Sequence, residues 1–371
     1  MSKVMKIALI ILLVLILAVI GIGVYVLTSV RADAVETVEK PIDLAATDEP
    51  QSITVVSEEP TPTPTEMPIY EETSKVDSIV NILLVGTDSR STSATEAAEG
   101  RSDSMMLASI DTNKGTITLV SFMRDSRVHR IGKSGRFTFF NRLNGAFSGG
   151  YGGGGPGELI NTLNENFKLD IQEYITIGFD GFAAMIDKIG GLDVDCDQAE
   201  INFINDRIKG NFVNEPDVVR QAQPIKDAPG VLHLDGAQCL IYARNRHTGV
   251  EGGQGNDYDR VNRQQEIIQL VFEKVTKQMN EQSVLALISF ATGYVTTNMK
   301  LETMTDLAKV LLNKGMTFNK SAIPAAGSYH NFVDEDGTKT DQLEFDLDKA
   351  AADLNTLLYG SSFVPTPTPT K

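Results

Sequence analysis

Cysteine and histidine are scarce in this sequence of 371 residues, which holds two cysteines and four histidines. Their positions do not show the paired spacing of a zinc site, so we expect no zinc centre. Cys196 and Cys239 lie far apart in the chain, and sequence alone does not give their separation in space. A disulfide between them is permitted if this part of the chain is exported. We favour two free, small, buried thiols.

Positive charge is also in short supply. The chain has 33 lysines and arginines against 49 aspartates and glutamates, for a formal net charge of −16 at pH 7. Binding to nucleic acid without regard to sequence needs a basic surface, so the composition argues against a nucleic-acid partner. Any site for an anion must therefore be built locally, from a few clustered cations.

Two common motifs are missing as well. No G-x-S-x-G segment is present, so we do not propose a serine triad. A glycine-rich stretch at 148–157 precedes an expected helix, but it lacks the GK[ST] ending of a nucleotide-binding loop. A flexible loop or lid is the better interpretation of this stretch than a phosphate cradle.

The amino-terminal region contains one long apolar run. Residues 7–30 carry no charge, and at about 1.5 Å per residue they span a hydrocarbon core of roughly 30 Å. Lys3 and Lys6 precede the run, so residues 1–6 are expected to stay cytoplasmic. A cleaved signal peptide is the alternative, because Ala32-Asp33-Ala34 resembles a cleavage site, but its apolar region is typically about 7–15 residues. We expect a retained single-pass anchor in the cell membrane.

The remainder of the chain divides into three parts. Residues 31–75 are acidic and rich in proline and threonine, which is typical of an extended extracellular linker. Residues 76–362 form one continuous globular region without an internal repeat. A proline- and threonine-rich tail at 363–371 ends the chain. The globular region is thus expected to be one extracellular domain.

Strand and helix patterns are mixed within this domain. The apolar runs at 81–86, 105–111 and 116–123 predict strands, and two of them are apolar enough to be buried on both faces. Helical periodicity or helix end signals occur at 158–167, 179–191, 259–279, 281–291, 303–314 and 345–360. This pattern predicts an α/β fold: a three-layer α/β/α sandwich with a central mixed sheet.

Four arginines, Arg244, Arg246, Arg260 and Arg263, lie in one short segment at 242–265. We expect a helix to begin near Arg260, capped by an aspartate at position 257 or 259. Its periodicity places Arg260 and Gln264 one turn before an apolar stripe, so both should point inward at a helix N-terminus that favours anions.

A phosphate-type site is one interpretation of this segment, with Arg263 close to the same face. Ion pairing on a solvated surface is the other. Arg244 and Arg246 are two residues apart and can face one ligand only if the preceding helix has ended by then.

A second cluster follows the predicted strands. Asp88 and Arg124 come at carboxyl ends of strands, and Arg101 and Asp103 directly precede another strand. Ligand sites of α/β sheets lie at that edge. Carboxylates beside arginines suggest Mg²⁺, which takes one or two carboxylates together with phosphate and water. The alternative is a set of salt bridges between loops.

The sequence resembles a known family, the LytR-CpsA-Psr proteins of Gram-positive cell walls. Each motif alone is weak, but together and in order they are specific. The resemblance rests on VGTDSR, RSDSMMLASID, SFMRDSRV, LNGAFSGG, YITIGFDGFAAMIDKIGGLDVD, HLDGAQCLIYARNR and GNDYDRVNRQQ. It implies an α/β/α sandwich with an apolar channel for a lipid. Met123 departs from the family pattern, which usually has proline there.

The resemblance also implies a reaction and its residues. The family is understood to transfer glycopolymers, such as teichoic acid or capsule, from undecaprenyl pyrophosphate to peptidoglycan. By this resemblance Asp88 and Asp103 hold Mg²⁺, and Asp257 matches a possible base. The positions implied to bind pyrophosphate are Arg101, Arg124, Arg244, Arg246, Arg260 and Gln264; we add Arg263 from its spacing.

We therefore expect an enzyme, a phosphotransferase-type glycopolymer–peptidoglycan transferase. Planar arginine forks and Mg²⁺ would stabilise the charge that develops on the pyrophosphate leaving group. Two alternatives stay open: a lipid-pyrophosphate hydrolase that uses the same residues, and a non-enzymatic regulator associated with the cell envelope. The expected partners are the polyprenyl-linked glycopolymer, peptidoglycan and the membrane.

Overall fold

The structure is a computed structural model. It describes residues 78–88, 102–131, 137–148, 154–210, 215–248, 256–278, 287, 290, 293–299 and 316–360. Several predictions lie outside these residues: the membrane anchor, the linker and tail, Arg101, most of the glycine-rich stretch, and the helices expected at 281–291 and 303–314. No helix in the described part is both long and apolar enough to span a bilayer.

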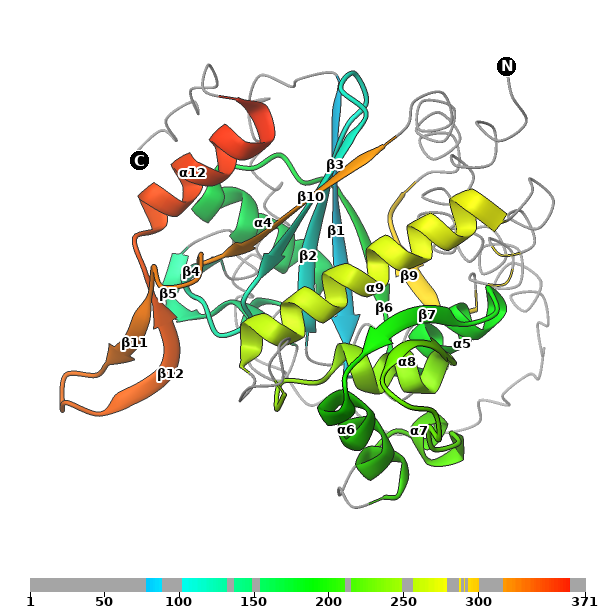
Figure 1. The fold of residues 1–371 in the computed structure, drawn as a ribbon. Coiled ribbons are helices and arrows are strands. Elements are labelled where there is room, and N and C mark those ends of the chain that lie inside the picture. Colours follow the sequence, from blue (N-terminus) through cyan, green and yellow to red (C-terminus); the bar gives the residue numbers. More distant parts are fainter. Residues whose placement is uncertain are drawn as a thin grey trace, which may run out of the picture.

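A mixed sheet of six strands forms the centre of the domain (Figure 1). The strands are β1 (Ile79–Thr87), β2 (Ser102–Asp111), β3 (Thr116–Phe122), β6 (Glu173–Ile177), β9 (Val295–Thr297) and β10 (Thr317–Ile323). Their order is β10-β3-β2-β1-β6-β9. β1 runs parallel to β6 and antiparallel to β2, and β3 is antiparallel to β2. The carboxyl ends of β1, β3 and β6 therefore meet at one edge, together with the amino end of β2.

Side chains that alternate along the central strands divide the core in two. Ile82 and Met106 belong to one apolar cluster, whereas Leu83 and Leu107, their immediate neighbours, belong to a second cluster. Helices α4 (Pro156–Phe167) and α12 (Leu347–Tyr359) cover one face of the sheet. Helices α5 (Phe179–Lys188), α8 (Gly236–Ala243) and α9 (Asp257–Gln278) cover the other (Figure 1). The central mixed sheet is confirmed, and burial on both faces explains the long apolar runs within β1, β2 and β3.

The start of α9 differs from the prediction. We expected Asp257 or Asp259 to cap the helix, but the cap is Asn256. Its Oδ1 accepts hydrogen bonds from the backbone N–H of Tyr258 (2.7 Å) and Asp259 (3.3 Å). The carboxylate of Asp259 in turn accepts from the N–H of Asn256 (2.9 Å). The reciprocal pair satisfies N–H groups that the first turn leaves without helical partners.

Polar contacts fix α9 against the sheet. The amide of Gln265 donates to Ser121 Oγ (3.0 Å) on β3 and to the carbonyl of Ser321 (2.7 Å) on β10. About two turns further on, Phe272 packs edge-on against Phe318 of β10 with ring centroids 4.8 Å apart. Because both strands hold the helix, its rotation about its own axis is set, and so is the direction of every side chain on it.

Met123 has a physical consequence at the end of β3. Its backbone N–H donates to the carbonyl of Ile323 on β10 (2.8 Å), and the residue is 2% exposed. A proline at this position has no N–H and could not make that bond. The departure from the family pattern thus extends the pairing of β3 with β10 up to Arg124.

Three two-stranded sheets lie outside the central sheet and were not predicted. They are β4 (Arg127–Ile131) with β5 (Phe137–Arg142), β7 (Leu192–Cys196) with β8 (Gly230–Leu234), and β11 (His330–Val333) with β12 (Lys339–Glu344). A 3-10 turn, η1 (Leu143–Ala146), and helices α6 (Gln198–Ile208) and α7 (Asp217–Gln221) complete the described elements. The cysteines are free and buried, as expected, and burial raises the pKa of Cys196 to about 12.

We expect Gly236→Ala to destabilise the domain strongly. A Cβ at Gly236 would lie 2.0 Å from the carbonyl oxygen of Ala183 in α5. Overpacking of this kind typically costs about 1–3 kcal/mol of unfolding free energy, and backbone atoms cannot move aside as a side chain can. Urea denaturation monitored by circular dichroism measures the change. Gly157→Ala is the matched control, because a Cβ there meets nothing within 4 Å. Equal stability of the two variants would contradict the close approach of α5 and α8.

Candidate functional site

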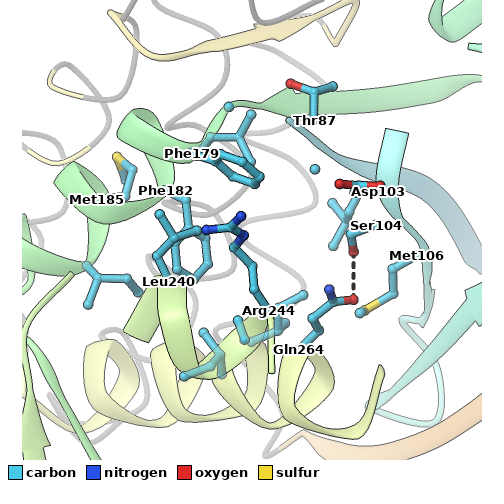
Figure 2. A pocket seen from close by; sticks show the side chains of 18 of the residues that line it. Thr87, Asp103, Ser104, Met106, Phe179, Phe182, Met185, Leu240, Arg244 and Gln264 are labelled. Atoms are coloured by element: carbon cyan, nitrogen blue, oxygen red, sulfur yellow. Dashed lines mark hydrogen bonds between the residues drawn. The ribbon is translucent and has the colours of Figure 1, made fainter. Parts of the chain in front are cut away.

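A cavity of about 420 Å³ lies between the sheet and helices α5, α8 and α9 (Figure 2). It opens at the edge where the carboxyl ends of β1, β3 and β6 meet. Its apolar wall is formed by Leu84, Met106, Ile175, Ile177, Phe182, Met185, Ile186, Leu240, Ile241, Ile267, Ile268 and Val271, among others. Its polar residues include Thr87, Asp103, Ser104, Arg124, Arg207, Arg244, Arg246, His247, Arg260 and Gln264. One space therefore combines a surface suited to hydrocarbon with a concentration of positive charge.

Helix α9 supplies both kinds of surface from one side. Arg260 and Gln264 line the cavity near the start of the helix, and Ile267, Ile268 and Val271 line it further on. This is the shared face that the spacing predicted. Gln264 is held by Ser104, whose hydroxyl donates to Oε1 (3.0 Å; Figure 2). Along this helix the lining of the cavity therefore changes from polar to apolar.

Arg124 follows β3 and is fixed by carboxylates. Its Nη1 donates to Asp103 Oδ1 (3.0 Å), and its Nε donates to Asp125 Oδ2 (3.3 Å). Burial opposes the charge of Arg124, but the carboxylates of Asp125, Asp257 and Asp103 outweigh burial and raise its pKa. The side chain is 22% exposed, so it is held in place and still reaches the cavity.

Arg260 lies in a less favourable environment. Its Nη2 donates to Asp257 Oδ2 (2.8 Å), and its side chain is only 8% exposed. Burial lowers the pKa of Arg260, and repulsion from Arg124 and Arg246 acts in the same direction. Its Nε is buried and has no hydrogen-bond partner among the described residues. A bound anion would both accept from this donor and relieve the repulsion.

Arg244 and Arg246 follow the end of α8. The helix ends at Ala243, so the two arginines can face one space, and both line the cavity. The guanidinium of Arg244 lies over the ring of Phe179, 4.5 Å from its centroid, and extends between α5 and the strand ends (Figure 2). That these residues bind a ligand stays a prediction, but their placement around one cavity is what such a ligand requires.

Not all of the residues proposed to bind the metal or to act as the base line the cavity. Asp103 lines the cavity, and Asp88 follows Thr87, which also lines it. Asp257 does not line the cavity but contacts it through Arg260. Within the described residues no group of three or more histidines, cysteines or carboxylates could hold a metal ion on its own. One or two carboxylates beside arginines nevertheless fit Mg²⁺, because phosphate oxygens and water commonly complete its shell.

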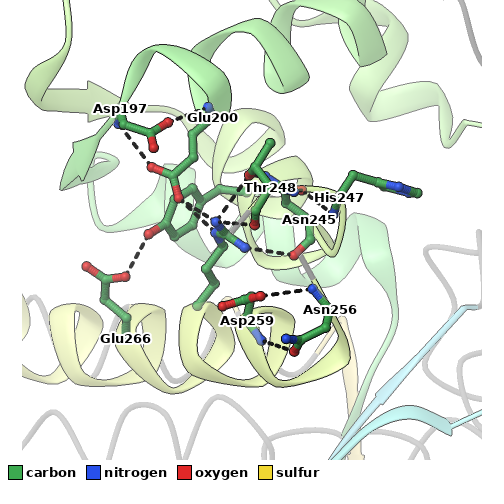
Figure 3. A network of polar contacts seen from close by, with 10 residues as sticks. Asp197, Glu200, Asn245, His247, Thr248, Asn256, Asp259 and Glu266 are labelled. Atoms are coloured by element: carbon green, nitrogen blue, oxygen red, sulfur yellow. Dashed lines mark hydrogen bonds and ion pairs between the residues drawn. The ribbon is translucent and has the colours of Figure 1, made fainter. Parts of the chain in front are cut away.

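Arg263 is not where we expected it. It is 1% exposed and does not line the cavity. It bonds instead to Glu200, Asn245 and Thr248, three members of the polar network that Figure 3 shows. Its Nε and Nη2 donate to Glu200 Oε1 (2.9 and 2.7 Å). Its Nη1 and Nη2 donate to the carbonyls of Asn245 (3.0 Å) and Thr248 (2.9 Å). These contacts occupy the guanidinium, so Arg263 supports the backbone of the loop that carries Arg244 and Arg246 instead of contacting a ligand.

The sequence did not predict Arg207 and Ser104 as part of the polar lining, and for His247 it favoured an ordinary loop residue over a proton carrier. Arg207 comes from α6, and His247 stacks on Phe203 with ring centroids 5.6 Å apart. Burial lowers the pKa of His247, and the charges of Arg246 and Arg207 lower it further. Ser104 was passed over as a strand residue. For Ser104 the only local signal was its position next to the predicted Asp103. No local signal indicated Arg207 on α6.

Comparison with known proteins identifies one family. The model described as LytR_cpsA_psr family matches residues 42–349. A curated relative, the polyisoprenyl-teichoic acid–peptidoglycan teichoic acid transferase TagV of Bacillus subtilis, is 29% identical over 209 residues, which make up 56% of this chain and 47% of TagV. The chain spans about half the length of the curated relatives that it matches first.

Solved structures share the fold. Protein gbs0355 of Streptococcus agalactiae is similar with a TM-score of 0.60 and 22% identity, over 80% of this chain and 95% of that chain. The LytR-CPS2A-psr family protein YwtF (TagT), solved with bound octaprenyl pyrophosphate lipid, is similar with a TM-score of 0.51 and 18% identity, over 78% of this chain and 94% of that chain.

Replacing Arg263 by methionine removes a buried charge and keeps much of the volume. Glu200 would lose the guanidinium that neutralises it, so we expect the unfolding free energy to fall by about 3–5 kcal/mol. Chemical denaturation measures this. The double variant Arg263→Met/Glu200→Gln leaves no uncompensated carboxylate and should recover part of the loss. If the single variant stays within about 1 kcal/mol of the natural chain, the network does not support the loop.

Proposed function

Because the chain belongs to the LytR-CpsA-Psr family, we propose that it transfers a glycopolymer from a polyprenyl-pyrophosphate carrier to peptidoglycan. The polymer would be a teichoic acid, a capsule or a similar chain. The activity named for TagV supports the reaction class, and the lipid bound to TagT supports the carrier. In this proposal residues 7–30 anchor the protein in the cell membrane, and the catalytic domain lies outside the cell, between the lipid and the wall.

The observation that carries the proposal is the joint lining of one cavity. A polyprenyl pyrophosphate has a long hydrocarbon chain at one end and a concentrated negative charge at the other. The cavity offers Met106, Leu240 and Ile267 to the first and Arg124 and Arg244 to the second. A purely apolar pocket would not hold the pyrophosphate, and a purely cationic cleft would not hold the prenyl chain.

The reaction that fits this donor is a phosphoryl transfer. The acceptor hydroxyl attacks the phosphorus that carries the glycopolymer, and the bond from that phosphorus to the bridging oxygen breaks. The polyprenyl phosphate leaves with an additional negative charge. Arg124, Arg244 and Arg260 are held in place before the substrate arrives, so they can stabilise this charge without reorganising. The apolar wall keeps water away, which strengthens these interactions and disfavours hydrolysis.

The proton of the acceptor hydroxyl needs a base. Asp257 is our candidate, because its carboxylate lies at the rim of the site and is oriented by its contact with Arg260 (2.8 Å). Asp88 and Asp103 would hold Mg²⁺, which when bound neutralises charge on the phosphate oxygens. The contact of Asp103 with Arg124 (3.0 Å) already orients one oxygen of that carboxylate.

A transfer assay tests the proposal. The soluble region, residues 76–371, is incubated with a radiolabelled polyprenyl-pyrophosphate oligosaccharide, Mg²⁺ and peptidoglycan oligomers. We expect label to move to peptidoglycan, and Arg244→Ala and Asp103→Ala to slow this by about a hundredfold, as loss of a charge-stabilising group does. Arg220→Ala is the control, since Arg220 is 60% exposed on α7 and does not line the cavity.

The other outcomes of this assay would contradict the proposal. Label released to water, with none on peptidoglycan, would identify a lipid-pyrophosphate hydrolase. Tight binding of the donor without turnover would favour a regulator associated with the envelope. Unchanged transfer in both cavity variants would place the chemistry elsewhere in the molecule.

A further inference from the structure

A buried carboxylate joins two of the arginines at the mouth of the cavity. Glu215 is 3% exposed. Its Oε1 accepts from Arg207 Nη1 (2.6 Å), and its Oε2 accepts from Arg244 Nη1 (2.7 Å). Both arginines line the cavity, whereas Glu215 does not. The carboxylate therefore contacts the two cations from behind, on the side away from the space that they face.

Each of the two guanidinium groups is also supported by an aromatic ring. Arg207 lies over Phe203, 5.0 Å from the ring centroid, and Arg244 lies over Phe179 at 4.5 Å. A planar guanidinium that stacks on a ring and donates to a carboxylate has few rotamers left. The arginines come from separate elements, α6 and the end of α8, so Glu215 and the rings set the position of one relative to the other.

The two arginines keep access to the cavity. Both line it together with Arg246, and the side chains of Arg207 and Arg244 are 19% and 32% exposed, although Glu215 is buried. A partly exposed guanidinium beside a cavity can form charge-assisted hydrogen bonds with an anion that enters it. Both guanidinium groups are therefore placed to donate to a ligand in the cavity.

We propose that Arg207 is a further anion-binding residue of the cavity, and that Glu215 is the positioning residue that holds Arg207 and Arg244 toward it. The ligand group is a phosphate oxygen of the donor. It belongs to the second phosphate of the pyrophosphate, the one farther from the prenyl chain. This rests on the proposed function. Arg124, which follows β3, and Arg260, at the start of α9, then face the other phosphate, so the two sides of the mouth divide the pyrophosphate between them.

A comparison of two probes tests the assignment. The full chain, in detergent micelles, is titrated calorimetrically with farnesyl pyrophosphate and with farnesyl monophosphate, which lacks the second phosphate. The quantity measured is the ratio of the two dissociation constants. We expect Arg207→Ala to reduce the preference for pyrophosphate by about tenfold, as loss of a charge-assisted hydrogen bond does. Arg207→Lys, which keeps the charge without the fork, should restore part of the preference.

Glu215→Gln tests the positioning role. It keeps the shape of the side chain and removes the charge that holds both arginines, so the preference for pyrophosphate should fall although the arginines are still present. The melting temperature is measured alongside, and Glu215→Asp replaces Glu215→Gln if that variant does not fold. The matched control is Arg220→Ala, which changes the net charge as Arg207→Ala does but lies away from the cavity.

The results separate this inference from the proposed function. If the natural chain binds neither probe, the proposed function fails and the inference fails with it. If the natural chain prefers pyrophosphate and Arg207→Ala keeps that preference, as Arg220→Ala should, Arg207 belongs to a structural ion pair only. Equal weakening of both probes by Arg207→Ala would also overturn the assignment to the second phosphate.

Discussion

Repulsion among clustered arginines governs how the candidate site is built. In the described part of the chain, five arginines line one partly buried cavity: Arg124, Arg207, Arg244, Arg246 and Arg260. Like charges this close destabilise a fold unless carboxylates or a ligand offset them. Asp103, Asp125, Asp257 and Glu215 each contact one or two of these arginines. Burial and the charges of Arg124 and Arg246 still lower the pKa of Arg260, so we expect an anion in the cavity to relieve the repulsion.

The fold explains how the charge comes to lie beside an apolar channel. The mixed sheet brings the carboxyl ends of β1, β3 and β6 to one edge, where polar residues follow strands that are otherwise apolar. On the same side of the sheet α9 enters at that edge with Arg260 and Gln264 and continues inward with Ile267 and Ile268. The buried network around Arg263 then holds the loop that brings Arg244 over the opening.

The features that could be predicted from the sequence are those set by local geometry. Helical periodicity placed Arg260 above the apolar stripe, and long apolar runs marked the central strands. What could not be predicted depends on partners distant in the chain. Arg263 bonds to Glu200, 63 residues away, and Arg244 bonds to Glu215, 29 residues away. No periodicity reports such a pairing, so Arg263 was assigned to the ligand, and Arg207 was overlooked. The outlying two-stranded sheets were missed because their strands are short and partly exposed, which leaves little apolar signal.

If the proposed function is right, a lipid chain and its pyrophosphate share this one cavity. A crystal structure of residues 76–362 with a polyprenyl pyrophosphate bound tests this expectation. We expect phosphate oxygens within hydrogen-bond distance of Arg124, Arg244 and Arg260, and a prenyl chain packed between Met106 and Leu240. A prenyl chain bound outside the cavity, or a pyrophosphate held by other residues, would contradict it.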